Sequence, residues 1–419
     1  MNLNATHDPA RRSWIESANQ PATDFPLQNL PYGVFRRGEN HPPHLGVAIG
    51  DEILDLAALA ELDLLPAAAR AACRQTSLNE LLAAGPAVWT DLRARLSELL
   101  GADTCAEPLR TQIQRCLVPQ NSATLLLPAA IGDYTDFYTS LHHARNVGRA
   151  IKPEDPDSLV SSNFRWLPIA YHGRASSVVI SGTDFHRPMG QALAPGATEP
   201  VYGPCARLDF ELEMGFFVGP GNALGRPVPL ALAPEHIFGM VLLNDWSARD
   251  HQFWEMTPLG PFLGKNFCTS LSAWIVTMEA LAPFRLPQAR AAGEPQPLAY
   301  LADEADRLSG RLDVRLSVAL QTQAQRTRGL PGDQIAATNF SHQYWTIAQM
   351  LAQHTVGGCN LRPGDLLGTG TVSGPGAGEA GAIIELSEGG RRPVLLPSTG
   401  ETRTFLADGD AVVLRGHCE

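Results

Sequence analysis

The chain reads LDFELEM at residues 208–214, a stretch in which acidic and apolar residues alternate. Side chains alternate between the two faces of a β-strand, so Glu211 and Glu213 point the same way, roughly 6–7 Å apart along the strand. The run GFFV follows at 215–218 and is typical of a strand that is buried on both faces. An acidic pair on such a strand predicts a binding site. The alternative is a half-buried strand with a solvated acidic face.

Two further carboxylates lie in apolar or aromatic surroundings. Asp136 lies in DYTDFY at 133–138, and Asp245 follows an apolar run in VLLNDW at 241–246. Asp245 could instead form an Asx turn, and Asp136 could cap a following helix. Burying an ionised carboxylate without a partner costs several kcal/mol, so four such acids are expected to converge on a cation. Oxygen-only ligands suit a hard divalent ion such as Mg²⁺, Ca²⁺ or Mn²⁺ and suit zinc poorly.

The acids belong to long segments that resemble the fumarylacetoacetate hydrolase family. Besides LDFELEM, the matching segments in the second part of the chain are IGDYTDFY at 131–138, HHARNVG at 142–148, YHGRASSVV at 171–179, NDWSARD at 244–250, PLGPFLGK at 258–265, GCNLRPGDLL at 358–367 and DGDAVVLRGHC at 408–418. The N-terminal part resembles the family in FPLQNLPYGVF at 25–35 and GVAIGDEILDL at 46–56. The resemblance therefore spans most of the chain.

The resemblance implies a role for each matching position. It implies a divalent ion, Mg²⁺ or Ca²⁺, with the four acids as its ligands: Asp136, Glu211, Glu213 and Asp245. It implies that two more residues surround the metal: Lys265 and Thr269. It implies three catalytic residues, a general base, the carboxylate that orients it and a cationic donor: His143, Glu385 and Lys265. It implies a substrate-binding set: Tyr138, Lys152, Tyr171, Gln252, Met256 and Thr371.

The general base has two neighbouring candidates, His142 and His143. The seven-residue spacing from Asp136 would bring His143 to the same face if the segment were helical throughout, and His142 would be turned about 100° away. The resemblance also selects His143. Glu385 lies in a predicted strand at 382–387, where an acid often simply faces solvent, so its functional interpretation depends mainly on the resemblance.

Two positions depart from the family pattern. The family has arginine where Lys152 stands and tyrosine where Met256 stands, and both positions line its substrate pocket. Lysine keeps the charge but loses the bidentate fork for a carboxylate, and methionine leaves an adaptable apolar contact. A related acylpyruvate or diketo acid is therefore an alternative substrate.

The implied reaction is hydrolysis of a carbon–carbon bond in a 1,3-diketo acid. The expected products are fumarate and acetoacetate, at the last step of tyrosine and phenylalanine catabolism. A metal would stabilise the enolate-like leaving group, and a histidine paired with a carboxylate would take the proton from water. Lys265 and Gln252 would stabilise the oxyanion. The alternatives are keto-acid decarboxylation, hydration or tautomerisation at the same metal site, and a non-catalytic metal-binding protein.

Composition bounds the class of partner. The chain has 419 residues, 44% of them hydrophobic and 18% charged, and a formal net charge of −11. The acidic balance disfavours nucleic acid and anionic membranes, and no apolar run reaches the roughly 18 residues that a membrane span needs. Seven cysteines without a CxxC pair, together with a polar N-terminus, favour free thiols in a reducing compartment. We therefore expect a cytoplasmic enzyme acting on a small molecule.

The chain is predicted to be mainly β, of the α+β class, with two domains at 1–120 and 121–419. We expect a loosely ordered lead-in over 1–24, short strands with a hairpin over 25–56, and helices over 57–115 with caps at Ser77 and Thr90. Short strands dominate after that. The resemblance implies a small SH3-like barrel, then a larger β-roll domain, and assembly as a homodimer.

Overall fold

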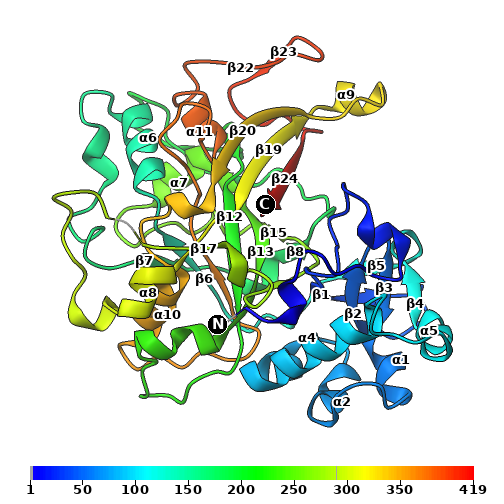
Figure 1. The fold of residues 1–419 in the computed structure, drawn as a ribbon. Coiled ribbons are helices and arrows are strands. Elements are labelled where there is room, and N and C mark those ends of the chain that lie inside the picture. Colours follow the sequence, from blue (N-terminus) through cyan, green and yellow to red (C-terminus); the bar gives the residue numbers. More distant parts are fainter. Residues whose placement is uncertain (1–2, 289) are drawn as a thin grey trace.

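The computed structural model describes residues 3–288 and 290–419, and its N-terminal part forms a five-stranded antiparallel sheet with helices beside it (Figure 1). The strand order is β4-β3-β2-β1-β5. The bounds are β1 (Tyr32–Arg36), β2 (His44–Ile49), β3 (Glu52–Asp55), β4 (Leu117–Pro119) and β5 (Thr124–Leu126). The predicted hairpin is β2–β3, which turns at Gly50 with φ of 57°. Strand β5 carries the sheet beyond residue 120, and the division of the chain there stays a prediction.

The segment between β3 and β4 is helical, as the sequence predicts. Its helices are α1 (Leu56–Glu61), α2 (Ala67–Cys73), α3 (Asn79–Ala83), α4 (Pro86–Leu100) and α5 (Glu107–Gln114). The predicted caps are wrong, because α3 begins after Leu78 without a side-chain cap and Thr90 lies inside α4. Helix α4 begins one turn earlier, at Pro86, whose fixed φ suits the first helical position.

The lead-in is more ordered than expected. Its described part, from residue 3 onward, forms two short 3₁₀ helices, and Ile15 and Ala18 are buried in the core of the N-terminal sheet. Residues 1–2 of the predicted lead-in lie outside the described residues.

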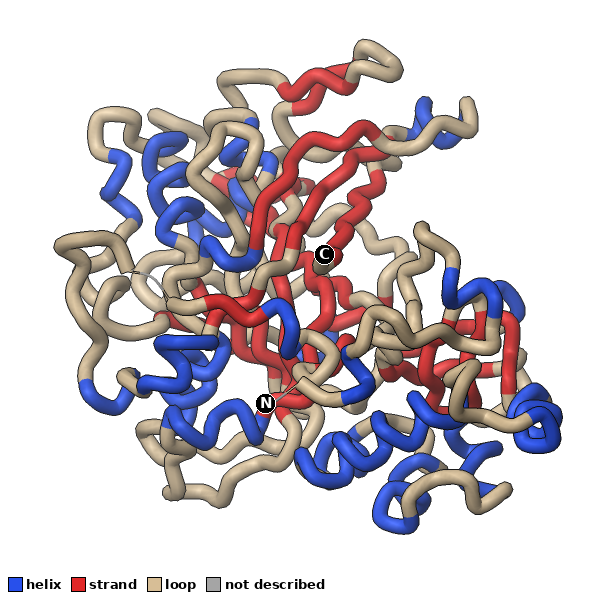
Figure 2. The backbone as a smooth tube through the Cα atoms, in the orientation of Figure 1, coloured by secondary structure: helices blue, strands red, loops and turns tan. Residues whose placement is uncertain are grey.

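A larger sheet forms the centre of the molecule (Figure 2). Its strand order is β7-β6-β21-β12-β13-β15-β8, and β16 also pairs with β13. The bounds are β6 (Tyr134–Tyr138), β7 (Ile169–His172), β8 (Val178–Ile180), β12 (Leu212–Val218), β13 (Ile237–Asp245), β15 (Thr269–Leu271), β16 (Val276–Thr277) and β21 (Leu366–Gly368). The α+β class with a smaller N-terminal and a larger C-terminal part is confirmed.

Strand β12 is buried on both faces, as the sequence predicts. Phe217 packs into the core shared with the N-terminal sheet, whereas Met214 and Phe216 pack into a second core on the opposite face. Full burial of one such side chain contributes about 1.5–3 kcal/mol. The side chains of Glu211 and Glu213 lie on the same face as that of Phe217. The candidate site is therefore built on a strand that is buried on both faces.

The remaining elements surround this sheet. A three-stranded sheet has the order β20-β19-β24, formed by β19 (Arg315–Gln321), β20 (Asp333–Asn339) and β24 (Ala411–His417). Short strand pairs are β9 (Met189–Ala192) with β10 (Val201–Pro204), β11 (Leu208–Asp209) with β14 (Ser247–Ala248), β17 (Arg285–Leu286) with β18 (Arg311–Leu312), and β22 (Val394–Leu396) with β23 (Glu401–Arg403). The helices are α6 (Leu141–Ile151), α7 (Arg249–Glu255), α8 (Glu304–Ser309), α9 (Gln323–Thr327), α10 (Ile347–Thr355) and α11 (Ile383–Leu386).

Near the site, one local expectation is wrong and one alternative interpretation does not hold. Glu385 lies in the short helix α11 and not in a strand. Asp136 is in the middle of β6 and caps no helix; the cap of α6 is Ser140, whose hydroxyl accepts from the His143 N–H. Asp136 and His143 therefore come from a strand and a helix, and their spacing of seven has no helical meaning. Among the described residues, no helix is long and apolar enough to cross a bilayer.

Candidate metal and acid–base site

Four buried carboxylates form a cup above the central sheet. One oxygen from each lies within 4.8 Å of one from every other, and none of the four residues is more than 5% exposed. Strand β6 supplies one, the segment entering β12 and β12 itself supply two, and the last residue of β13 supplies the fourth. They are Asp136, Glu211, Glu213 and Asp245.

Gly368 lets carboxylates from separated strands meet. Strand β21 lies between β6 and β12, and Gly368 is the register partner of Asp136 on one side. A Cβ at Gly368 would lie 2.6 Å from Asp136 Oδ1 and 3.1 Å from Glu213 Oε2. Gly370 follows with φ of 76°, and its N–H donates to Glu213 Oε2 at 3.0 Å. Gly368 at the end of β21 thus makes room for Asp136, and Gly370 binds Glu213.

Two cations neutralise one side of the cup. Lys265 Nζ donates to Asp245 Oδ2 at 2.6 Å and also to Glu211 Oε2. Arg249 Nη2 pairs with Glu211 Oε1 at 2.8 Å. Burial alone would raise the pKa of Glu211, but Lys265 and Arg249 outweigh it and hold that pKa below its usual range. Tyr171 and Thr269 add hydroxyl contacts to Asp245, at 2.9 and 3.4 Å.

On the other side of the cup, no side-chain cation of the described residues contacts the acids. Burial, and then the charge of Asp245, raise the pKa of Asp136 well above its usual range. Burial and the charge of Asp136 do the same to Glu213. Asp136 Oδ1 and Glu213 Oε1 are buried and have no hydrogen-bond partner within residues 3–288 and 290–419. Two orphaned carboxylate oxygens in an all-oxygen donor set fit a hard divalent cation, so the residues present are suited to hold one.

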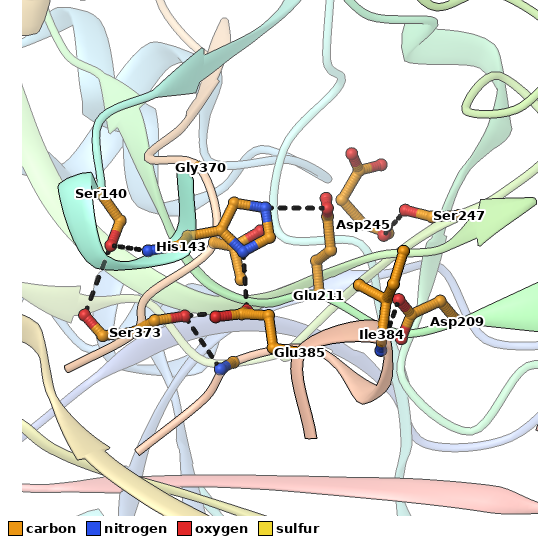
Figure 3. Close-up of polar contacts among 12 residues, drawn as sticks. Ser140, His143, Asp209, Glu211, Asp245, Ser247, Gly370, Ser373, Ile384 and Glu385 are labelled. Atoms are coloured by element: carbon orange, nitrogen blue, oxygen red, sulfur yellow. Dashed lines mark hydrogen bonds and ion pairs between the residues drawn. The ribbon is translucent and has the colours of Figure 1, made fainter. Parts of the chain in front are cut away.

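His143 and Glu385 form a buried pair beside the cup (Figure 3). His143 Nδ1 lies 2.6 Å from Glu385 Oε1, and its Nε2 lies 3.8 Å from Glu211 Oε1. A carboxylate accepts, so Nδ1 carries a proton toward Glu385, and Nε2 faces the cup. The alternative His142 is half-buried and packs its ring against His342 instead, at 6.0 Å between centroids.

Glu385 is held by three donors. Besides His143, it accepts from Ser373 Oγ at 2.9 Å and from Asn146 Nδ2 at 2.8 Å. Ser373 Oγ in turn accepts from the Gly381 N–H, in the loop that leads into α11. These contacts fix the carboxylate that orients the histidine ring.

Four of the residues expected to bind substrate lie around the cup. The Tyr138 ring packs edge-on against that of His143, at 5.6 Å, and Tyr171 binds Asp245 as described. The Gln252 side-chain carbonyl accepts from Arg249 at 3.2 Å, which leaves its amide nitrogen as a donor. Thr371 is buried just after Gly370.

The two departing positions lie farther out. Met256 is half-buried at the end of α7. Lys152 is exposed at the end of α6, nine residues after His143 and therefore about 13 Å along the helix. The structure does not bring the Lys152 side chain to the carboxylate cup.

Sequence reasoning missed several residues of this site. Arg249 stands within the quoted NDWSARD segment, and a basic residue just after a buried strand end was the available signal. Asn146 lies three residues after His143 on α6, a spacing that shares one helix face. Gly368 gave no signal, because its contacts depend on strand pairing between distant segments. Ser373 gave none either, because it lies in a loop without a periodic pattern.

Two protein-family models match this chain. Residues 134–417 match the model described as fumarylacetoacetate (FAA) hydrolase C-terminal, and residues 28–128 match the one described as fumarylacetoacetase N-terminal. Together the two models cover nearly the whole chain, and the C-terminal one covers all four carboxylates of the cup.

Curated relatives and a solved structure agree with these matches. The fumarylacetoacetase of Rattus norvegicus is 49% identical over 95% of this chain and 93% of its own length. The fumarylacetoacetases of Homo sapiens and Oryza sativa are 48% and 47% identical over 95% and 97% of this chain, each over 93% of its own length. A fumarylacetoacetate hydrolase structure from Exiguobacterium antarcticum covers 92% of this chain and 95% of its own, with a TM-score of 0.50 and 15% identity, which supports the fold alone.

Proposed function

The chain belongs to the fumarylacetoacetate hydrolase family, and from this premise we propose that its carboxylate cup and buried histidine hydrolyse 4-fumarylacetoacetate to fumarate and acetoacetate. The reaction cleaves a carbon–carbon bond of a 1,3-diketo acid with water. The observation that carries the proposal is the juxtaposition of the cup with Nε2 of His143, 3.8 Å from Glu211 Oε1.

Asp136, Glu211, Glu213 and Asp245 would hold the metal, and the two orphaned oxygens support this assignment. We propose Mg²⁺ or Ca²⁺, since both take oxygen ligands. When bound, the cation would act as a Lewis acid toward the diketone oxygens and the enolate-like leaving group. Lys265 and Thr269 would hold Asp245 in place beside it.

His143 acts as the general base. Glu385 holds the proton on Nδ1, so Nε2 is free to take a proton from the attacking water. The protonated ring is stabilised by the Glu385 carboxylate, as in other histidine–carboxylate pairs. The proton at Nε2 is then available to the enolate carbon of the departing acetoacetate.

Two groups can donate to the oxyanion at the attacked carbon. Lys265 uses two of its three N–H bonds on Glu211 and Asp245, which leaves one for a ligand. Gln252 has a free amide nitrogen because its carbonyl accepts from Arg249. Preorganised donors of this kind stabilise charge that develops only in the transition state. Five residues stay predicted substrate contacts: Tyr138, Tyr171, Met256, Thr371 and Lys152.

Steady-state hydrolysis by the purified protein tests the proposal. The substrates are fumarylacetoacetate, fumarylpyruvate and a short acylpyruvate, each before and after chelation and with Mg²⁺ or Ca²⁺ added back. Metal-dependent cleavage with a preference for fumarylacetoacetate is expected. Preference for an acylpyruvate would change the assigned substrate, and the change would be attributed to the altered positions Lys152 and Met256. Absence of cleavage, with decarboxylation or hydration of a keto acid instead, would contradict the hydrolase.

We also propose that the enzyme is a cytoplasmic homodimer. Large apolar side chains are exposed on the β9–β10 hairpin, near the end of α7 and on the loop after α7. They are Met189, Val201, Tyr202, Trp254, Leu259, Phe262 and Leu263. Trp254 Nε1 donates to Gln191 of the hairpin, and Glu255 accepts from the N–H of Phe262, so the two segments lie together. An apolar surface of this kind supports association with a second copy. The seven free thiols support a reducing compartment.

A further inference from the structure

Asp209 is a fully buried carboxylate outside the metal cup. Its relative exposure is 0%, and it lies in β11, two residues before Glu211. It is not among the four carboxylates that converge. A buried carboxylate needs partners, and the partners of Asp209 connect two parts of the site.

The first partners of Asp209 are in the helix that carries Glu385. Asp209 Oδ1 accepts from the Ile383 N–H at 2.7 Å, and Oδ2 accepts from the Ile384 N–H at 3.2 Å (Figure 3). These are the first two amides of α11, and a helix has no partners of its own for them. Ala382, at the N-cap, has no side-chain acceptor. Asp209 therefore caps α11 from a neighbouring strand.

The other partner is in the wall of the cup. Arg249 Nε donates to Asp209 Oδ2 at 2.8 Å, while its Nη2 pairs with Glu211. One carboxylate thus ties the start of α11 to the arginine that pairs with a proposed metal ligand. All four residues in this chain of contacts are buried: Asp209, Arg249, Glu211 and Ile383.

We infer that Asp209 is a positioning residue that fixes α11 against the cup so that Glu385 meets Nδ1 of His143. Glu385 is the third residue of the four-residue helix, so any movement of the first turn moves its carboxylate. The inference rests on the proposed function for the role of His143. It adds a residue that touches neither metal nor substrate and acts through Glu385.

Asp209→Asn removes this link with little change of shape. The amide oxygen still accepts on one side, but the NH₂ group then faces another donor on the other side. In one orientation that donor is the Ile383 N–H, and in the other it is the Ile384 N–H together with Arg249 Nε. We expect kcat to fall about 10–100-fold, as for other residues that orient a reacting group, with KM changed less than about threefold. Asp365→Asn is the matched control, because Asp365 is also a buried carboxylate that accepts two backbone N–H bonds, from Asp133 and Arg362.

A double-mutant cycle with Glu385→Gln tests whether Asp209 acts through Glu385. If it does, Asp209→Asn costs much less kcat in the Glu385→Gln background than in the wild type. Losses that multiply independently would overturn the inference, and so would a kcat for Asp209→Asn equal to that of the Asp365→Asn control.

Amide hydrogen exchange gives a readout that does not depend on activity. In Asp209→Asn, exchange over residues 382–387 is expected to rise at least about tenfold while the strand β12 amides stay protected. Unchanged exchange there would refute the link even if kcat fell. Absence of turnover by the wild-type enzyme on every substrate would instead contradict the proposed function, and the hydrogen-exchange result would still hold. If Asp209→Asn does not fold, Ile383→Pro is the second variant. It removes the N–H that donates to Asp209 Oδ1 at 2.7 Å, at a first helical position where proline is tolerated, and the same double-mutant cycle applies.

Discussion

Gly368 and Asp136 are direct register partners across the parallel strands β21 and β6, and the glycine leaves the space that the Asp136 carboxylate occupies. An added Cβ would lie 2.6 Å from Asp136 Oδ1, 3.1 Å from Glu213 Oε2 and 3.2 Å from the Tyr134 hydroxyl. Contacts this short force the carboxylates apart. The absence of one side chain therefore determines the geometry of the proposed metal site.

Gly368→Ala is expected to weaken metal binding by about 10–100-fold, since displaced ligands bind poorly. Isothermal titration calorimetry with Mg²⁺ and Ca²⁺ measures the metal affinity. Gly357→Ala is the control, because a Cβ at Gly357 meets nothing within 4 Å. Equal affinities in the two variants would show that the cup adapts and that the glycine is not required.

His143→Gln should lower kcat by about 10²–10⁴-fold, the range for loss of a general base, and should leave metal affinity unchanged. His142→Gln is the neighbouring control and should keep nearly full activity, because that ring packs against His342, whereas Glu385 contacts the His143 ring. The test is kcat for both variants together with calorimetry for the metal. A collapse of kcat in the His142 variant alone would move the base to that residue.

The sequence predicted the shared face of Glu211 and Glu213 and the burial of their strand, because both depend on local pattern. Alternation over 208–214 places Glu211 and Glu213 on one face, and β12 is buried on both sides. Glu385 was expected in a strand, since an apolar run of four to six residues suits a strand or a buried helix equally. The roles of Asp209 and Gly368 were beyond prediction. Ile383 lies 174 residues after Asp209, Asp136 and Glu213 lie more than about 150 residues before Gly368, and local pattern does not record contacts between such distant segments.

Asp306 gives a pH dependence of stability that is separate from the cup. Burial raises the pKa of Asp306 to about 6, although Thr346 donates to both of its oxygens. Because the folded pKa lies above the unfolded one, this group's contribution to stability is fully present below about pH 4 and is lost as the pH rises through about 6. The contribution is at most about 3 kcal/mol.

Asp306→Asn should therefore melt at a higher temperature than the wild type at pH 7.5, and this advantage should disappear toward pH 4.5. The measurement is the difference in Tm between variant and wild type across that range at fixed metal concentration, which cancels the titration of the cup. The exposed Asp91→Asn on α4 should show a flat difference. A flat difference for Asp306→Asn would contradict the raised pKa.

Phe262→Glu should convert the proposed dimer to a monomer, because it puts a charge into the exposed apolar segment beside α7. Phe262 is 65% exposed, and burial of a charge at an apolar interface is costly. Light scattering after size exclusion should give the mass of two chains for the wild type and of one chain for the variant. Leu224→Glu, at a site 78% exposed on another loop, should stay dimeric. A monomeric wild type would exclude the dimer.

Chelation should destabilise the protein, because the ion compensates the two carboxylates that contact no side-chain cation in the described part of the chain. Asp136 and Glu213 each have a buried oxygen without a partner, and each has a raised pKa from burial and from neighbouring acids. A cation that binds only the folded state stabilises it by about 2.7 kcal/mol at a hundredfold excess over Kd. Asp136→Asn removes one of those charges, so the variant should melt above the wild type when both are metal-free. It should also lose most of the rise in Tm that Mg²⁺ or Ca²⁺ gives the wild type. A wild type whose Tm ignores both chelator and added metal, or a variant that responds to metal as the wild type does, would remove Asp136 from the ligand set.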